Sequence, residues 1–371
     1  MKWVFWTSAA LVAYTYFGYP IWVGVRARRW PRPAHSGQFL PSVSIVIAAH
    51  NEAPSLPRKL ANLAALDYPP DRLELVVVSD GSTDSTEAIL APAARTGVRT
   101  VVLAERIGKA AALNCAVEAC TGEIILFTDA RQVLEENAVR TITECFADPE
   151  VGCVSGELML GDPESGIYGE GVGLYWKMEK KVRQWESASG SVVGATGAMY
   201  AVRRIFWVPF PKGTILDDVL LPLEVARQGG RVIFESRARA WDPYSPGFRQ
   251  EFRRKVRTLT GNYQLLQLAP WLLTRRNPLR FALISHKLLR LLVPFALAGI
   301  LLSSLLISEL VYRVVLTMQI AFYASAILAL CRPRLIVLSR LGNASMAFLV
   351  LNTAAAVACL YFLSGKKEVW R

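Results

Sequence analysis

Two segments decide the fold of this chain: residues 42–52, SVSIVIAAHNE, and residues 73–84, LELVVVSDGSTD. Each is a nearly continuous apolar run that ends in polar and acidic residues. Such runs are typical of strands that are buried on both faces of a parallel sheet. Residues 100–104 and 123–128 predict two more strands. Amphipathic patterns between the strands predict four helices, over residues 56–66, 83–95, 109–120 and 135–146. Strands that alternate with helices predict an α/β domain with a mostly parallel, Rossmann-like sheet flanked by helices.

The rest of the chain is unusually apolar. Of its 371 residues, 53% are hydrophobic and only 19% are charged, which is less charge than an ordinary soluble protein carries. Four uncharged stretches are long enough to cross a bilayer. They are one N-terminal stretch and three C-terminal ones, at residues 3–25, 291–308, 314–331 and 341–365. A cleaved signal peptide is the alternative for the first stretch, but an uncleaved anchor fits its length better.

We therefore expect four parts along the chain. They are an N-terminal transmembrane anchor with its basic flank, a soluble α/β domain, an interfacial amphipathic segment and a C-terminal transmembrane bundle, at residues 1–33, 34–262, 263–290 and 291–371. Lys and Arg residues beside the spans predict a multi-pass protein of the cell (inner) membrane with the α/β domain in the cytoplasm. Basic residues after position 365 oppose this orientation, so either they are tolerated outside or the number of spans differs by one.

The net charge of +12 has a simple explanation, because a membrane-proximal surface attracts anionic lipid head groups. No nucleic-acid-binding motif accompanies it, so we predict membrane lipid and no nucleic acid as a partner. The first strand is followed by no G-x-G-x-x-G, and the chain has no Walker-type phosphate loop. These absences argue against a dinucleotide-dependent oxidoreductase and a phosphate-loop ATPase.

Acidic residues follow three of the predicted strands. Glu52 follows the first strand, Asp80 and Asp84 follow the second, and Asp129 follows the fourth. The carboxyl ends of parallel strands meet at one edge of the sheet, where ligands bind in such folds. Each residue alone would also suit a turn or a helix cap. Together the carboxylates are able to accept hydrogen bonds from a nucleoside, while Asp129 is able to hold a divalent cation against a diphosphate.

These motifs resemble the nucleotide-sugar-binding half of glycosyltransferase family 2, in the membrane-bound branch that includes cellulose, chitin and hyaluronan synthases. The resemblance covers about residues 42–264 and implies a GT-A fold. It rests on five motifs in the order of the family: Asn51-Glu52, Asp80-Gly81-Ser82-x-Asp84, the strand ending at Asp129, the acidic pair Asp217-Asp218, and the basic segment 253–257.

On the donor side, the resemblance implies that Glu52 and Asp80 contact the nucleoside and that Asp84 supports the same turn. Asp129 is similar to the first Asp of the D-x-D motif of the family, which holds Mg²⁺ or Mn²⁺ against the donor diphosphate. Arg131 stands where the family has the second Asp. It is able either to reach a phosphate or to pair with a neighbouring acid, so the usual two-carboxylate metal site is incomplete.

On the acceptor side, the resemblance assigns the general base to Asp218, beside Asp217. A helix beginning at this pair is the structural alternative, because acids are favourable at helix N-termini. Thr196 and Gly197 lie in the segment that resembles the acceptor loop. Three basic residues, Arg254, Lys255 and Arg257, stand where the family has Q-x-x-R-W and would stabilise the leaving diphosphate, although a plain basic helix is the alternative. Thr258 replaces the Trp that stacks on sugar in processive synthases.

The resemblance thus implies an inverting glycosyltransferase that moves a sugar from a nucleotide-sugar, for which we expect a UDP-sugar, to a lipid-linked or glycan acceptor at the cytoplasmic membrane face. A processive polysaccharide synthase is the alternative within the class. A catalytically silent membrane scaffold that retains the fold is the alternative outside it.

Overall fold

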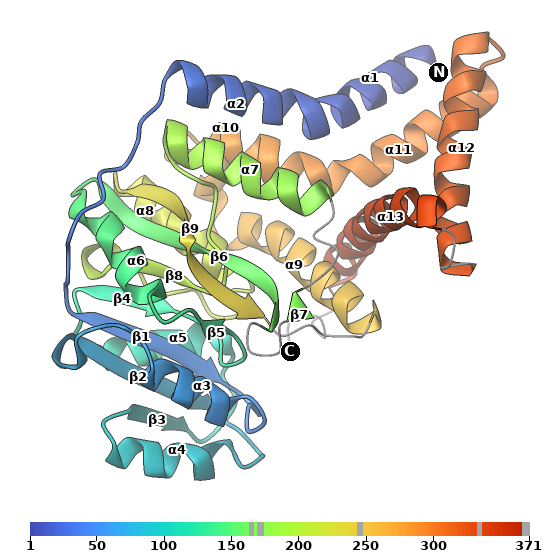
Figure 1. The fold of residues 1–371 in the computed structure, drawn as a ribbon. Helices are drawn as coiled ribbons and strands as arrows, with labels where there is room; N and C mark the ends of the chain where they lie inside the picture. The colour runs from blue at the N-terminus through green and yellow to red at the C-terminus, as the bar shows by residue number, and fades with distance from the viewer. Residues whose placement is uncertain (163–166, 169–173, 243–247, 332–335, 366–371) are drawn as a thin grey trace.

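The structure is a computed structural model, and it describes the chain except residues 163–166, 169–173, 243–247, 332–335 and 366–371 (Figure 1). Its α/β domain is built on one sheet, and its helices of highest hydropathy project from one side of that domain. The boundaries expected between the four parts of the chain stay predictions.

The first half of the sheet is parallel, as predicted. Strands β1 (Val43–Ala49), β2 (Leu73–Asp80), β3 (Arg99–Leu103) and β4 (Ile124–Phe127) all pair in parallel, in the order β3-β2-β1-β4. In this register Ala49 lies beside Ser79, so β1 and β2 end at the same edge. The residues that follow β1 and β2 therefore lie at the same edge of the sheet.

The second half of the sheet is mixed. It continues from β4 through β8, β6, β9 and β5. Their bounds are Tyr200–Arg203, Val151–Asp162, Arg231–Asp242 and Val133–Leu134, and β7 (Ile167–Tyr168) pairs with β6. Strand β8 is antiparallel to both of its neighbours, whereas β6 and β9 are parallel.

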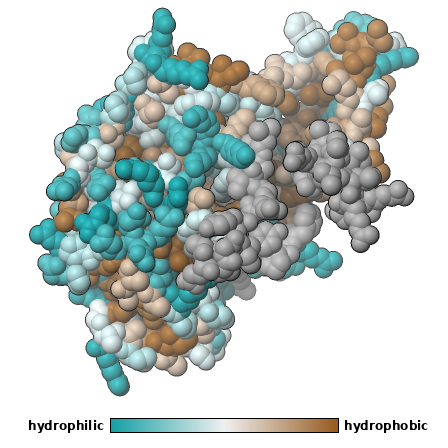
Figure 2. Space-filling view, viewed as in Figure 1, coloured by the Kyte–Doolittle hydropathy of each residue, from teal (hydrophilic) through white to brown (hydrophobic). Residues whose placement is uncertain are grey.

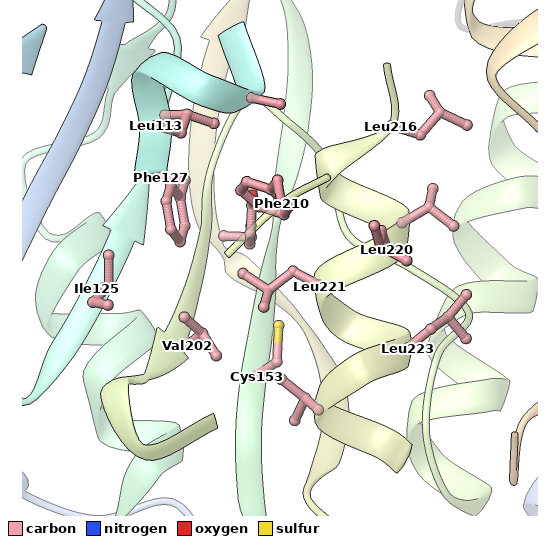
Figure 3. Packing of buried hydrophobic residues seen from close by; sticks show 14 of the residues in the cluster. Leu113, Ile125, Phe127, Cys153, Val202, Phe210, Leu216, Leu220, Leu221 and Leu223 are labelled. Atoms are coloured by element: carbon pink, nitrogen blue, oxygen red, sulfur yellow. The ribbon is translucent and has the colours of Figure 1, made fainter. Parts of the chain in front are cut away.

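Helices cover both faces of the sheet. The four predicted helices are present as α3, α4, α5 and α6, with the bounds Leu56–Ala64, Thr86–Arg95, Lys109–Glu118 and Ala138–Glu144. Alternate residues of each strand point to opposite faces, so Val46 joins the hydrophobic cluster of α5 and α8 (Asp217–Arg227), whereas Ile45 joins that of α3 and α6. Figure 3 shows Phe127, Val202 and Leu221 in the first cluster.

Strand β3 departs from the expectation that every strand is buried on both faces. It forms the edge of the sheet, and Val102 is 54% exposed. Its apolar residues were sufficient to predict a strand, but they did not reveal its place in the sheet.

Three helices are long and apolar enough to cross a membrane, at Arg280–Leu306, Leu310–Leu328 and Ser345–Leu363. They belong to the continuous helix α10–α11 (Arg280–Leu306, with a π-helical part), to α12 (Leu310–Cys331) and to α13 (Ile336–Leu363). Figure 2 shows hydrophobic residues gathered over α12. The first of these helices begins within the segment that we expected to lie in the membrane surface, so it carries charges that the predicted span lacked.

The predicted N-terminal anchor is a helix but is not among the candidate spans. Helices α1 (Lys2–Ala13) and α2 (Tyr19–Arg29), joined by a π-helical turn, run beside α11 and α7 (Leu174–Ser189) (Figure 1). Many Trp, Tyr, Ser and Thr residues lower the hydropathy of this segment. Its packing on the domain helix α7 is the feature that an uncharged stretch does not reveal.

Candidate active site

The centre of the acidic rim is a lysine. Lys109 is the first residue of α5, and its Nζ lies 2.8 Å from Oδ1 of Asp129 and 3.5 Å from Oδ1 of Asp217. The side chains of Lys109 and Asp129 are 33% and 37% exposed, so a ligand is able to reach them. Acids from separate segments thus converge on one ammonium group at the carboxyl ends of the strands.

Asp80 holds the loop that leads to Lys109. Its two carboxylate oxygens accept hydrogen bonds from the backbone N–H groups of Ile107 and Gly108, at 2.7 and 2.9 Å. Gly81 has φ +59°, and a Cβ atom at this position would lie 2.3 Å from the nitrogen of Arg106. The sequence assigned Asp80 to the nucleoside, but in the structure the carboxylate is buried and bound to the backbone.

The loops after β1 and β2 are joined to each other. Asp84 accepts hydrogen bonds from the N–H groups of Ala53 and Thr86 at 3.1 and 3.0 Å, and the Thr86 hydroxyl lowers the pKa of its carboxyl. Asn51 accepts from the N–H of Thr83 at 2.8 Å. Asp84 therefore joins this turn to the loop after β1, which carries the half-buried Glu52.

Asp129 is held in its ionised form. Burial acts to raise the pKa of its carboxyl, but the positive charges of Lys109, Arg131 and Lys59 outweigh burial and lower this pKa. Its Oδ1 accepts from Lys109, which leaves Oδ2 for a second cation.

Arg131 pairs with an acid, the second of its two predicted possibilities. Its guanidinium donates two hydrogen bonds to Asp242 at the end of β9, at 2.8 and 3.1 Å. Arg254 of α9 (Phe248–Leu268) lies 4.0 Å from the same carboxylate. The buried Asp242 therefore occupies the guanidinium that we assigned to the donor, and it also brings Arg254 to this side of the rim.

Asp217 and Asp218 are the first two residues of α8, so both lie at a helix N-terminus, the structural alternative given above. The environments of their carboxylates differ. Asp217 is buried and accepts a hydrogen bond from the Tyr200 hydroxyl at 2.9 Å. Asp218 accepts one from the N–H of Gly197 at 2.9 Å. Burial and the charge of Asp217 raise the pKa of Asp218 to about 6, against the opposing effects of Lys109 and Lys287. A carboxyl with a pKa near neutrality suits a general base.

The predicted acceptor loop lies against this base. A Cβ atom on Gly197 would lie 3.4 Å from Oδ2 of Asp218, which is an ordinary contact distance, so the loop lies directly against this carboxylate. The N–H of Thr196 donates to the Ser155 hydroxyl at 3.1 Å, and this hydroxyl accepts from Arg183 of α7 at 2.6 Å. The loop is thus fixed between β6, α7 and α8.

Of the predicted diphosphate residues on α9, Lys255 and Arg257 make no contact with the acidic rim in the described part of the chain. Lys255 pairs with Glu251 of its own helix, and Arg257 is exposed. Val256 between them packs against Ala354 and Ala358 of α13. Both residues thus lie on a basic helix that packs against α13, and their assignment to the diphosphate stays a prediction.

Sequence reasoning missed several residues of the site. Lys109 had a signal, because a Gly-Lys pair follows the third strand, whose carboxyl end lies at the same rim. Four others, Tyr200, Ser155, Arg183 and Asp242, had none. They lie on β6, β8, β9 and α7, whose places relative to the rim depend on pairing between distant segments.

The donor set around Asp129 fits a divalent cation that is shared with a substrate. The described residues contain no group of three His, Cys, Asp or Glu side chains able to hold a metal ion by themselves. Mg²⁺ and Mn²⁺ bound with a nucleotide commonly take one or two carboxylates, and phosphate oxygens and water supply the other ligands. Oδ2 of Asp129 is such a carboxylate ligand.

The sheet order and the acidic rim with Lys109 at its centre are those of a GT-A-type fold. Residues 44–206 match the family model of glycosyl transferase family 2. This match lies within the α/β domain and identifies that segment as a domain of glycosyl transferase family 2.

Curated relatives and a solved structure agree with this assignment. The poly-beta-1,6-N-acetyl-D-glucosamine synthase of Staphylococcus aureus strain COL is 24% identical over 233 residues, which are 61% of this chain and 56% of that protein. The probable glycosyltransferase YdaM of Bacillus subtilis strain 168 is 25% identical over 272 residues, 69% of this chain and 64% of that one. The match thus spans little more than half of these relatives.

The solved structure is a mannosyltransferase from Pyrobaculum calidifontis in complex with GDP-Man and Mn²⁺. It superposes with a TM-score of 0.73 at 25% identity, and the match covers 98% of this chain and 99% of that one. The likeness therefore includes the C-terminal helices as well as the α/β domain.

Proposed function

We propose that the chain transfers a single sugar from a nucleotide-sugar to a lipid-linked or glycan acceptor, with inversion at the anomeric carbon and with Asp218 as general base. The observation that carries this proposal is the raised pKa of Asp218, a carboxyl next to the Lys109–Asp129 pair. Asp218 accepts the proton of the acceptor hydroxyl, and the oxygen of that hydroxyl attacks the anomeric carbon of the donor sugar. The bond to the nucleoside diphosphate breaks in the same step, so no glycosyl-enzyme forms.

The donor side of the proposal assigns the nucleoside to the joined loops of Glu52 and Asp84 and the diphosphate to Lys109. Asp129 would hold Mg²⁺ or Mn²⁺, which supplies positive charge to the leaving diphosphate. The solved mannosyltransferase supports this arrangement, because it contains GDP-Man and Mn²⁺. We expect Asp129→Ala to lower the rate of sugar transfer about 100-fold, because the metal ion loses a carboxylate ligand. Excess chelator should have a similar effect, because it removes the metal ion itself. Full activity in chelator contradicts the metal assignment.

The acceptor side of the proposal places the reaction at the membrane. Lys287, which affects the pKa of Asp218, belongs to the first candidate span. The base is therefore close to the end of a membrane helix, where the head group of a lipid-linked acceptor would lie. We keep the cytoplasmic orientation as part of the proposal, on the basic residues that flank the spans.

A processive polysaccharide synthase is the second candidate function. The match to the S. aureus poly-beta-1,6-N-acetyl-D-glucosamine synthase favours it, whereas Thr258, in place of the sugar-stacking Trp, favours single transfer. The length of the product separates the two, because a ladder of products supports the synthase.

The test uses the full chain in lipid nanodiscs with Mn²⁺, membrane lipid extract as acceptor, and either UDP-N-acetylglucosamine or GDP-mannose. We expect Asp218→Asn to lower transfer about 1,000-fold while it retains donor binding, because only the proton acceptor is lost. Asp71→Asn, an exposed residue before β2, is the matched control and should transfer normally. Normal transfer by Asp218→Asn contradicts the assignment, and no turnover by the unaltered chain supports the silent scaffold.

A further inference from the structure

A second, buried lysine holds the turn that carries Asp129. Lys59 of α3 is 1% exposed. Its Nζ donates to the hydroxyl of Thr128 at 3.0 Å and to the carbonyl oxygen of Gln132 at 2.8 Å. These two partners lie on either side of Asp129 in the sequence, so the ammonium group closes the turn that carries the acid.

An ammonium group in such a place is unfavourable unless its interactions compensate for the loss of water. Burial lowers the pKa of Lys59 to about 7, and the charge of Asp129 opposes this effect. Arg131, from the loop after Asp129, and Arg58, from α3 itself, line the same cavity of about 150 Å³. Asp129 is thus the acid that faces Lys59, and the two arginines are its cationic neighbours.

The Thr128 hydroxyl extends this contact to the acceptor loop. It donates a hydrogen bond to the carbonyl oxygen of Ala198 at 2.7 Å. The preceding residue, Gly197, donates its N–H to Asp218. A continuous chain of contacts therefore runs from Lys59 through Thr128 and the loop to the proposed general base.

The two lysines beside Asp129 differ in what a substrate is able to reach. Lys109 is part-exposed and bridges Asp129 and Asp217, so a bound diphosphate would compete for it. Lys59 is enclosed and bound to a hydroxyl and a backbone carbonyl, so it keeps its partners when a donor binds. Its two bonds therefore hold the turn of Asp129 throughout the reaction.

We propose that Lys59 is a positioning residue for sugar transfer, which holds the Asp129 turn directly and the Asp218 loop through Thr128. This inference rests on the proposed function, because it takes Asp129 and Asp218 as working groups. It assigns two separable effects to two bonds. The Lys59 ammonium serves donor binding through Asp129, and the Thr128 bond to Ala198 serves the chemical step through Asp218.

The test compares kcat and the donor KM of full-chain variants in nanodiscs, with Mn²⁺ and the donor that the unaltered chain uses. We expect Lys59→Met to raise KM and to lower kcat, each about tenfold, because both loops lose their anchor. Thr128→Val should lower kcat about tenfold with little change in KM, since Lys59 keeps its bond to Gln132. Thr128→Ser, which retains the hydroxyl, should restore kcat.

The matched control is Thr143→Val on α6, which removes another buried hydroxyl that donates to a backbone carbonyl, that of Arg140. Its kcat and KM should equal those of the unaltered chain. Equal loss of kcat in Thr128→Ser and Thr128→Val, or unchanged kinetics in Lys59→Met, overturns the inference.

If the unaltered chain shows no turnover, the proposed function fails and the inference is decided by hydrogen exchange. Faster exchange in Lys59→Met at both residues 128–133 and 194–199, with Thr128→Val affecting only the second segment, supports it. Unchanged exchange at residues 194–199 in both variants overturns it.

Discussion

Two clusters of charged residues, one at the start of α8 and one on α7, are built from similar groups. In the first, Lys109 lies between Asp129 and Asp217 at the rim of the sheet. In the second, the imidazole of His286 lies between Glu179 and Glu186 of α7, at 2.9 and 2.8 Å. Both clusters place a nitrogen base between two carboxylates.

Exposure separates the clusters. Lys109 and Asp129 are about one-third exposed, whereas His286 and Glu186 are each 2% exposed. Glu186 also accepts from the Tyr19 hydroxyl of α2 at 2.6 Å, and Glu179 accepts from Arg290 of α11. The second cluster therefore joins the α/β domain to the N-terminal helix and to the first candidate span. We infer that the open cluster serves substrate and the closed cluster serves assembly.

The largest expected effect is at the open cluster. Lys109→Met should lower kcat/KM about 100- to 1,000-fold, because it removes the positive charge placed for the leaving diphosphate. Steady-state kinetics with the full chain measure this loss. A lower melting temperature with an unchanged rate per folded molecule would contradict a substrate role for the Lys109 cluster, since a purely structural ion pair behaves in that way.

A smaller effect is expected from pH. Asp218 must be ionised to accept a proton, and its pKa in the free enzyme is raised to about 6. Activity should therefore be full above this pKa and fall as pH drops through it, about tenfold for each further unit in kcat/KM. A pH–rate profile between pH 4.5 and 8 tests this, and a flat profile down to pH 4.5 contradicts the role of Asp218 as base.

The smallest effect on catalysis is expected at the closed cluster. Glu186→Ala leaves the buried His286 and Tyr19 without this partner, so it should lower the unfolding free energy by about 3 kcal/mol. The rate per folded molecule should change less than about twofold. Glu150→Ala is the control, because the Glu150–Arg32 pair is half-exposed and should contribute less than about 1 kcal/mol. Thermal unfolding and active-site titration together measure both quantities, and a large rate loss in Glu186→Ala would join the two clusters into one functional unit.

The donor half of the fold was predictable because its information is local. Residues 42–52 and 73–84 specify a buried strand and its polar end within one segment each, and parallel pairing then brings those ends together. Lys109 was missed only as a functional group, since its helix was predicted at the correct place.

The long-range contacts of the site were less predictable because their information is distant in the sequence. Asp242 reaches Arg131 across 111 residues, and His286 reaches Glu186 across 100. Neither pairing has a periodic or compositional signal. The same holds for Lys59, which the pattern of α3 presents simply as one position of a short helix.

The sequence by itself determined the class of fold, the presence of its first four strands, the acids at the carboxyl ends of three of them and the three apolar C-terminal helices. These features depend on hydrophobic periodicity and on residues that are neighbours in the chain. Only the tertiary structure decided that Asp129 and Asp217 share the ammonium group of Lys109 and that Lys59 holds the turn of Asp129. It also decided which charged cluster is enclosed by helices, because burial and long-range pairing arise only when distant segments pack together.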